Sequence, residues 1–133
     1  MLASALDSIR LFLHVIGATI WVGGQLTLAA LVPVLRAVDP TLPKKAARAF
    51  NKIAWPAYGL LIVTGIWNVA KAPADATSSY HTALAIKMMV VALSGVAAYL
   101  HSKAKSTPAL AIWGALSGLS ALGATYLGAL LAG

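Results

Sequence analysis

Four long apolar stretches dominate the sequence and decide what the chain can fold into. They run from about Leu11 to Leu35, Ile53 to Ala70, Thr82 to Leu100 and Ala109 to Ala132. Each is close to the roughly 20 residues that an α-helix needs to cross the hydrocarbon core of a bilayer. Backbone polar groups in lipid must bond within their own segment, so such stretches are expected to be helical. The sequence therefore predicts an all-α fold, an integral membrane four-helix transmembrane bundle formed by residues 1–133 as a single domain.

Composition supports a lipid environment for these stretches. Of the 133 residues, 60% are hydrophobic and only 10% are charged, whereas soluble domains carry about 25% charged residues. The absence of cysteine excludes disulfides, Cys-ligated zinc and iron–sulfur clusters. The formal net charge of +7 does not indicate a nucleic-acid partner, because the cations gather in short segments between the apolar stretches.

The distribution of these cations predicts the orientation in the membrane. The first connecting segment holds Arg36, Lys44, Lys45, Arg48 and Lys52, and the third holds Lys103 and Lys105. Segments rich in Lys and Arg stay in the cytoplasm. We therefore expect loops one and three to be cytoplasmic and both termini to face outward, most naturally across a bacterial plasma membrane.

One stripe of the first stretch carries unusual chemistry. Gly17, Trp21, Gly24 and Gln25 follow His14 at spacings of three, seven, ten and eleven, which places them on one helical face. Ionisable groups within a span are costly and often functional. The glycines would let either a neighbouring helix or a flat ligand approach. Two interpretations stay open: His14 binds a ligand, or it bonds to a neighbouring helix while the glycines serve packing.

The third stretch holds the other ionisable candidates. Lys87 lies one to two turns inside it, at a depth expected to resemble that of His14. Its long stem would equally allow it to reach the outer headgroups. His81 lies at the outer mouth, where it could join His14 in a metal site, whereas His101 lies at the inner end and is expected to be interfacial.

Polar and small residues in the other two stretches favour packing over chemistry. Thr64, Gly65 and Asn68 cluster on one side of the second stretch, and Gly114, Ser117 and Gly118 form small-residue patterns in the fourth. Such residues let helices approach closely and hydrogen-bond to each other.

Three segments resemble a known group of membrane proteins. They are "LHVIGATIWVGGQL", "RAFNKIAWPAYGLLIVTGIWNV" and "HTALAIKMMVVALSGVAAYLH". In content and order they resemble the copper-resistance D (CopD) family and the HemJ-type protoporphyrinogen oxidases, which bind b-type haem. The resemblance implies that His14 and Lys87 are the functional pair. The chain has Asn51 and Lys52 where HemJ-type proteins carry a Met–Glu pair.

Three functions follow from these observations. The first is a bundle binding haem b for membrane redox or tetrapyrrole chemistry. His14 would be the axial ligand, Lys87 a second ligand or propionate partner, and Arg10 a propionate partner; Gly17 and Gly24 would admit the macrocycle beside Trp21. The second is an accessory or assembly subunit of a larger membrane redox complex, or a homo-oligomer. The third is copper handling, with His14 and either His81 or Met88 as the ligands. The sequence leaves open whether the protein is an enzyme.

Overall fold

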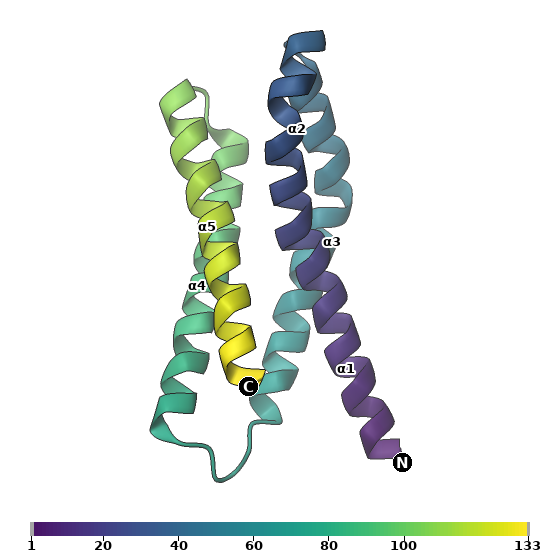
Figure 1. Cartoon of the computed structure of the whole chain (residues 1–133), viewed down its shortest axis with the longest axis vertical. Coiled ribbons are helices and arrows are strands. Elements are labelled where there is room, and N and C mark those ends of the chain that lie inside the picture. Colours follow the sequence, from purple (N-terminus) through teal and green to yellow (C-terminus); the bar gives the residue numbers. More distant parts are fainter. Residues whose placement is uncertain (1, 133) are drawn as a thin grey trace. The chain divides into compact units, whose positions relative to one another are not determined.

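The chain is a set of long helices joined by short connections (Figure 1). The computed structural model describes residues 2–132, and no strand occurs among them. The helices are α1 (Leu2–Ala18), the π-helical turn η1 (Thr19–Gly23), α2 (Gly24–Val38), α3 (Leu42–Ala70), α4 (Ser78–Lys103) and α5 (Thr107–Ala132). Because α1, η1 and α2 run on without a break, four of the described helical rods are long and apolar enough to cross a membrane. The all-α, membrane-type prediction is confirmed at this level.

Two compact units divide the chain, one up to Ala70 and the other from Lys71 onward. In the first, the continuous α1–η1–α2 rod lies antiparallel to α3. In the second, α4 lies antiparallel to α5. Each unit is thus a helical hairpin with its own internal packing.

The π-turn lies in the middle of the first rod. At its end, the backbone N–H of Gly24 donates to the carbonyls of both Ile20 and Trp21. The hydroxyl of Thr19 donates to Val15 O (2.7 Å), and that of Thr27 donates to Gly23 O (2.8 Å). A π-turn holds one residue more than an α-turn, and such bulges are frequent at functional sites.

A tight turn at Asp39–Thr41 reverses the chain between α2 and α3. One Asp39 carboxylate oxygen accepts bonds from both the backbone N–H and the hydroxyl of Thr41, each at 2.8 Å. These bonds, the backbone one first, lower the pKa of Asp39 below its ordinary value. Pro43 follows in the first turn of α3, where its missing N–H leaves no helical bond unmade.

The second hairpin packs through small side chains. Ser94 Oγ donates to Ser117 O (3.0 Å), and Ser117 Oγ donates to Ser94 O (3.1 Å). Both serines are buried, together with Gly95 and Ala97 of α4 and Ala121 of α5. Small residues of this kind let two helix backbones approach closely in a membrane.

The helices extend beyond the apolar stretches from which they were predicted. The second was expected from about Ile53, but α3 begins at Leu42. Lys44, Lys45, Arg48 and Lys52 consequently belong to a helix, and the prediction that they lie in a loop is wrong. Hydropathy marks the part of a helix that suits lipid, whereas the helix itself continues to its capping turn.

Candidate functional site

His14 is hydrogen-bonded to the facing helix. Its Nδ1 lies 2.8 Å from the hydroxyl oxygen of Thr64 in α3. That hydroxyl also lies 2.7 Å from Leu60 O, the carbonyl one turn earlier. A hydroxyl has one proton to donate, and a carbonyl can only accept. The Thr64 proton therefore goes to Leu60, and the proton between Thr64 and His14 belongs to Nδ1. This tautomer leaves the acceptor lone pair on Nε2.

Arg10 lies one turn before His14 and bonds to the same helix. Its guanidinium donates to the side-chain oxygen of Asn68 and, at 3.3 Å, to the carboxylate of Asp7. Its Nε is buried and has no hydrogen-bond partner among the described residues. Arg10, His14, Thr64 and Asn68 thus form two consecutive cross-links between α1 and α3, which we call the polar row.

The glycines of the predicted stripe are covered by α3. A Cβ at Gly17 would lie 3.1 Å from the carbonyl oxygen of Ala57 and 3.2 Å from Leu61 Cγ. A Cβ at Gly24 would lie 2.3 Å from the ring of Phe50. The space above both glycines is therefore filled by the neighbouring helix, and a flat ligand has no room directly against either glycine.

Trp21, between these glycines, is part of an aromatic cluster. Its ring centroid lies 4.6 Å from that of Tyr58 and 5.2 Å from that of Trp55. Trp21 is only 4% exposed. Buried aromatic groups at these separations contribute strongly to packing. The cluster anchors the π-turn to α3.

The other predicted residues lie in the second hairpin. Lys87 is half-buried in α4, and a Cβ at Gly128 of α5 would lie 3.4 Å from its Nζ. His81 is exposed beside the ring of Tyr80, with 5.9 Å between the centroids. His101 Nδ1 donates to Leu110 O (2.8 Å), and the ring covers Gly114. His101 is exposed near the end of its helix.

No metal-type cluster of three or more His, Asp or Glu side chains occurs within residues 2–132. Of the residues predicted to bind copper, His14 belongs to the first hairpin, and His81 and Met88 belong to the second.

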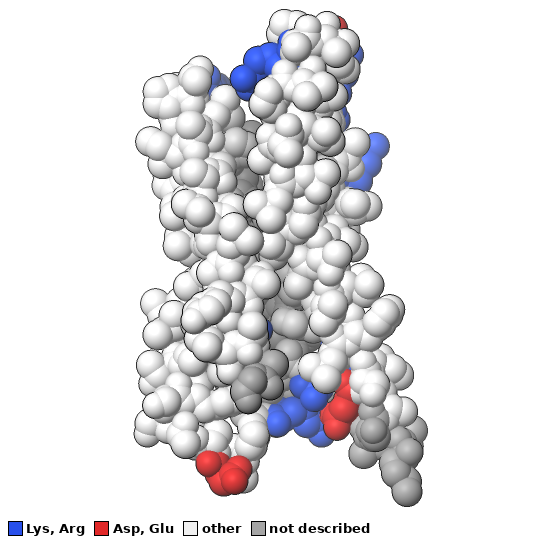
Figure 2. All heavy atoms as spheres, in the orientation of Figure 1, with Lys and Arg blue, Asp and Glu red and all other residues white. Residues whose placement is uncertain are grey.

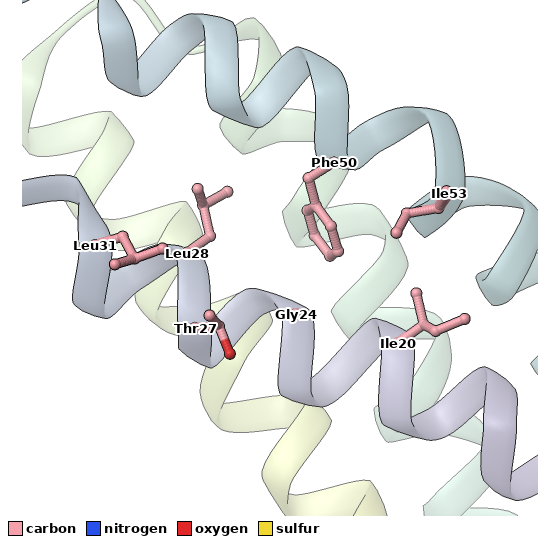
Figure 3. Close-up of a pocket in the computed structure, with 7 residues that line it drawn as sticks. All are labelled: Ile20, Gly24, Thr27, Leu28, Leu31, Phe50 and Ile53. Carbon is pink, nitrogen blue, oxygen red and sulfur yellow. The ribbon is translucent and has the colours of Figure 1, made fainter. Parts of the chain in front are cut away.

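An apolar groove on the first hairpin is a feature that the sequence did not reveal. Its volume is about 300 Å³, and it follows η1 and α2 along one side and α3 along the other (Figure 3). It is lined by Ile20, Gly24, Thr27, Leu28, Leu31, Phe50 and Ile53. The adjacency of Gly24 and Phe50 creates it, and no regular spacing in the sequence signals that contact. The lining includes no imidazole and no cation.

The comparisons with known proteins leave the family open. No protein-family model matches the chain. No solved structure matches it either. Over 90 residues it is 36% identical to an uncharacterized protein of Aquifex aeolicus (strain VF5), a match that covers 63% of this chain and 62% of that protein.

Proposed function

We propose that this chain is an integral membrane protein that binds haem b through His14 and exchanges electrons within the bilayer. The hydrogen bond between His14 Nδ1 and Thr64 is the observation that carries the proposal. Histidines that bind metals almost always donate their other ring N–H to a fixed partner, which sets the tautomer and the ring orientation. Bound haem would supply one-electron chemistry.

The polar row fits this role, whereas the glycines do not. His14 holds the tautomer needed for coordination through Nε2, and the buried Nε–H of Arg10 is the kind of donor that a propionate satisfies. Gly17 and Gly24 instead receive α3. The proposal therefore keeps His14 and Arg10 as haem contacts and gives the glycines a packing role. The resemblance to HemJ-type proteins also implies a role for Lys87, which lies in the second hairpin.

The first experiment is an optical spectrum of the protein purified in detergent, oxidised and then reduced with dithionite. A Soret band with b-type peaks is expected. The His14→Gln variant should lose it, because glutamine keeps a donor near Thr64 but offers haem no imidazole. The matched control is His101→Gln, which should retain it. A colourless protein after expression with excess haem, or equal haem in both variants, would overturn the proposal.

The orientation is proposed on charge alone, with the α2–α3 and α4–α5 turns in the cytoplasm of a bacterium and both termini outside. Because the chain has no cysteine, single cysteines introduced at Lys45 and at Asp75 report sidedness cleanly. A membrane-impermeant maleimide added to intact cells should label Asp75→Cys and spare Lys45→Cys. The reverse labelling pattern would show that the orientation in the membrane is opposite to the one proposed.

A second candidate function is that of an accessory subunit in a larger membrane redox complex. Only 11% to 22% of the residues in the most apolar windows of the four helices are buried within the chain. The remaining faces need lipid or partner helices to cover them. Co-purification of a stoichiometric membrane protein after mild solubilisation would support this function, and a lone or self-associated chain would count against it.

A further inference from the structure

The apolar groove on the first hairpin is shallow and open along one side, and its length matches a stretch of one hydrocarbon chain. Along the rod, its lining runs from Ile20 to Leu31. At about 1.5 Å per residue this distance is about 16 Å, which is close to half of the roughly 30 Å hydrocarbon core. Its volume of about 300 Å³ is at the lower end of small-molecule sites. A groove of this length and volume suits an extended chain.

The walls of the groove are apolar throughout. The one polar lining residue, Thr27, donates its hydroxyl to Gly23 O of its own helix (2.8 Å). Figure 3 shows the ring of Phe50 reaching from α3 toward α2 at Gly24. Leu31 and Ile53 are 46% and 56% exposed, so the groove is accessible from the side. Nothing in this lining would hold a polar or charged ligand group.

The end of the hairpin beside the groove is strongly basic. Exposed Arg36, Lys44 and Lys45 lie near the turn, and exposed Arg48 and Lys52 follow along the first three turns of α3, against the single carboxylate of Asp39. Figure 2 shows Lys and Arg atoms around the joined ends of α2 and α3. Lys44 is six residues before Phe50, about 9 Å along the helix, and flexible lysine side chains extend further. The apolar groove therefore runs toward cations that can meet an anionic group.

We propose that this hairpin binds an anionic phospholipid, with one acyl chain in the groove and the phosphate headgroup on the basic end of α3. Basic surfaces at helix ends favour anionic headgroups over zwitterionic ones. The groove restrains one chain of the same molecule. This inference does not rest on haem binding, since the groove and the polar row share no residue.

The test uses the full-length chain in nanodiscs made from equal amounts of phosphatidylglycerol and phosphatidylcholine. Lipids that stay bound after mild re-extraction are counted by mass spectrometry. We expect about one phosphatidylglycerol per chain, enriched over phosphatidylcholine, and a weaker enrichment at high salt. Equal retention of the two lipids would overturn the proposal.

Two variants separate the groove from the charge. Leu28→Trp fills the groove and should abolish stoichiometric retention, whereas Val63→Trp, at a 63% exposed position of α3 outside the groove lining, should not. In the triple variant Lys44→Gln, Lys45→Gln, Arg48→Gln, the preference for phosphatidylglycerol should fall by about fivefold for each cation removed. The control Lys103→Gln, Lys105→Gln on the second hairpin should keep it.

Each outcome decides a part of the proposal. If Leu28→Trp retains lipid as Val63→Trp does, the acyl chain is not in the groove and the proposal fails. If Leu28→Trp does not fold, the charge variants alone test the proposal. An unchanged preference for phosphatidylglycerol in the triple variant would then overturn the proposal. If a variant loses the bound lipid but still binds haem normally, the proposal that His14 binds haem stands independently of the lipid site.

Discussion

The two hairpins are both built from long apolar helices, yet they are held together differently. The second is regular, with small side chains and paired serine bonds between α4 and α5. The first carries a π-turn, an aromatic cluster, and the cross-links of His14 and Arg10 to α3. Regular packing needs only small residues, whereas an imidazole and a guanidinium inside a span call for partners at fixed positions.

The difference between the two hairpins indicates where to look for function in an apolar chain. In the second hairpin, the hydroxyls of Ser94 and Ser117 donate to backbone carbonyls of the partner helix. The first instead aligns side chain with side chain and leaves a defined tautomer at His14. The π-turn and the ionisable side chains of His14 and Arg10 lie together in the first hairpin. Substitutions in both hairpins test how far the two differ.

The largest effect is expected at Gly17. In Gly17→Leu, the new side chain meets the Ala57 carbonyl, a backbone group that cannot move aside without separating α1 from α3. Overpacking of this kind typically costs about 1 to 3 kcal/mol. Unfolding in mixed SDS micelles, followed by circular dichroism, measures the loss. Gly23→Leu is the matched control, because a Cβ there meets nothing within 4 Å. Equal losses would show that Gly17 is not a close-packing position.

The next effect is expected at Thr64 and concerns the ligand role of His14. Thr64→Val keeps the shape but removes the acceptor of the Nδ1 proton, so haem affinity should fall by about 10- to 100-fold. Haemin titration followed at the Soret band measures it. Thr125→Val removes a hydroxyl bonded to Ala121 O within α5 and should leave the affinity unchanged. If both variants bind haem equally well, Thr64 does not position the imidazole.

A smaller effect is expected from the serine pair of the second hairpin. Ser94→Ala and Ser117→Ala each remove one hydroxyl that donates to a carbonyl of the partner helix, and each should cost about 0.6 kcal/mol, the average for polar contacts between membrane helices. The same unfolding assay supplies the free energy of each variant. A loss above about 2 kcal/mol in either variant would show that this hairpin depends on polar bonds as much as the first does.

The smallest effect is expected at the turn of the first hairpin. The Thr41 bonds hold the pKa of Asp39 below its ordinary value, so the ionised carboxylate favours the folded turn. Its stabilisation is complete above the unfolded pKa of about 3.9 and is lost as the pH falls through the lower folded pKa. Thermal midpoints of the unchanged protein and Asp39→Ala should therefore differ near pH 6 and converge toward pH 2. A difference that grows on acidification would contradict this sign.

Hydropathy predicted the four long apolar helices, because a helix that crosses a membrane must be apolar along most of its length. It could not predict the helix ends, since α3 continues to Leu42 through a basic segment that contributes nothing to burial in lipid. Likewise, the spacing around His14 correctly placed His14, Gly17, Trp21 and Gly24 on one face. It could not tell that this face meets α3, because helix rotation is set by packing with residues far away in the sequence.

Thr64 and Phe50 illustrate the same limit for the candidate site. The small polar cluster at Thr64 was expected to serve helix packing, and its hydroxyl does cross-link two helices. Its effect on the His14 tautomer depends on one distance that no spacing rule supplies. Phe50, in turn, gives no signal beyond being apolar, and its position over Gly24 emerges only when the two helices are paired.

The π-turn at Thr19–Gly23 also bears on the ancestry of the first helix. A turn with one surplus residue absorbs a single-codon insertion without rotating the helix beyond it. A relative with one residue fewer between His14 and Gly24 would keep both halves directed at α3 through an uninterrupted α-helix. An alignment with such a relative would carry a one-position gap inside this segment. Aligning the two sequences without that gap would mispair every position from the π-turn to the Asp39 turn.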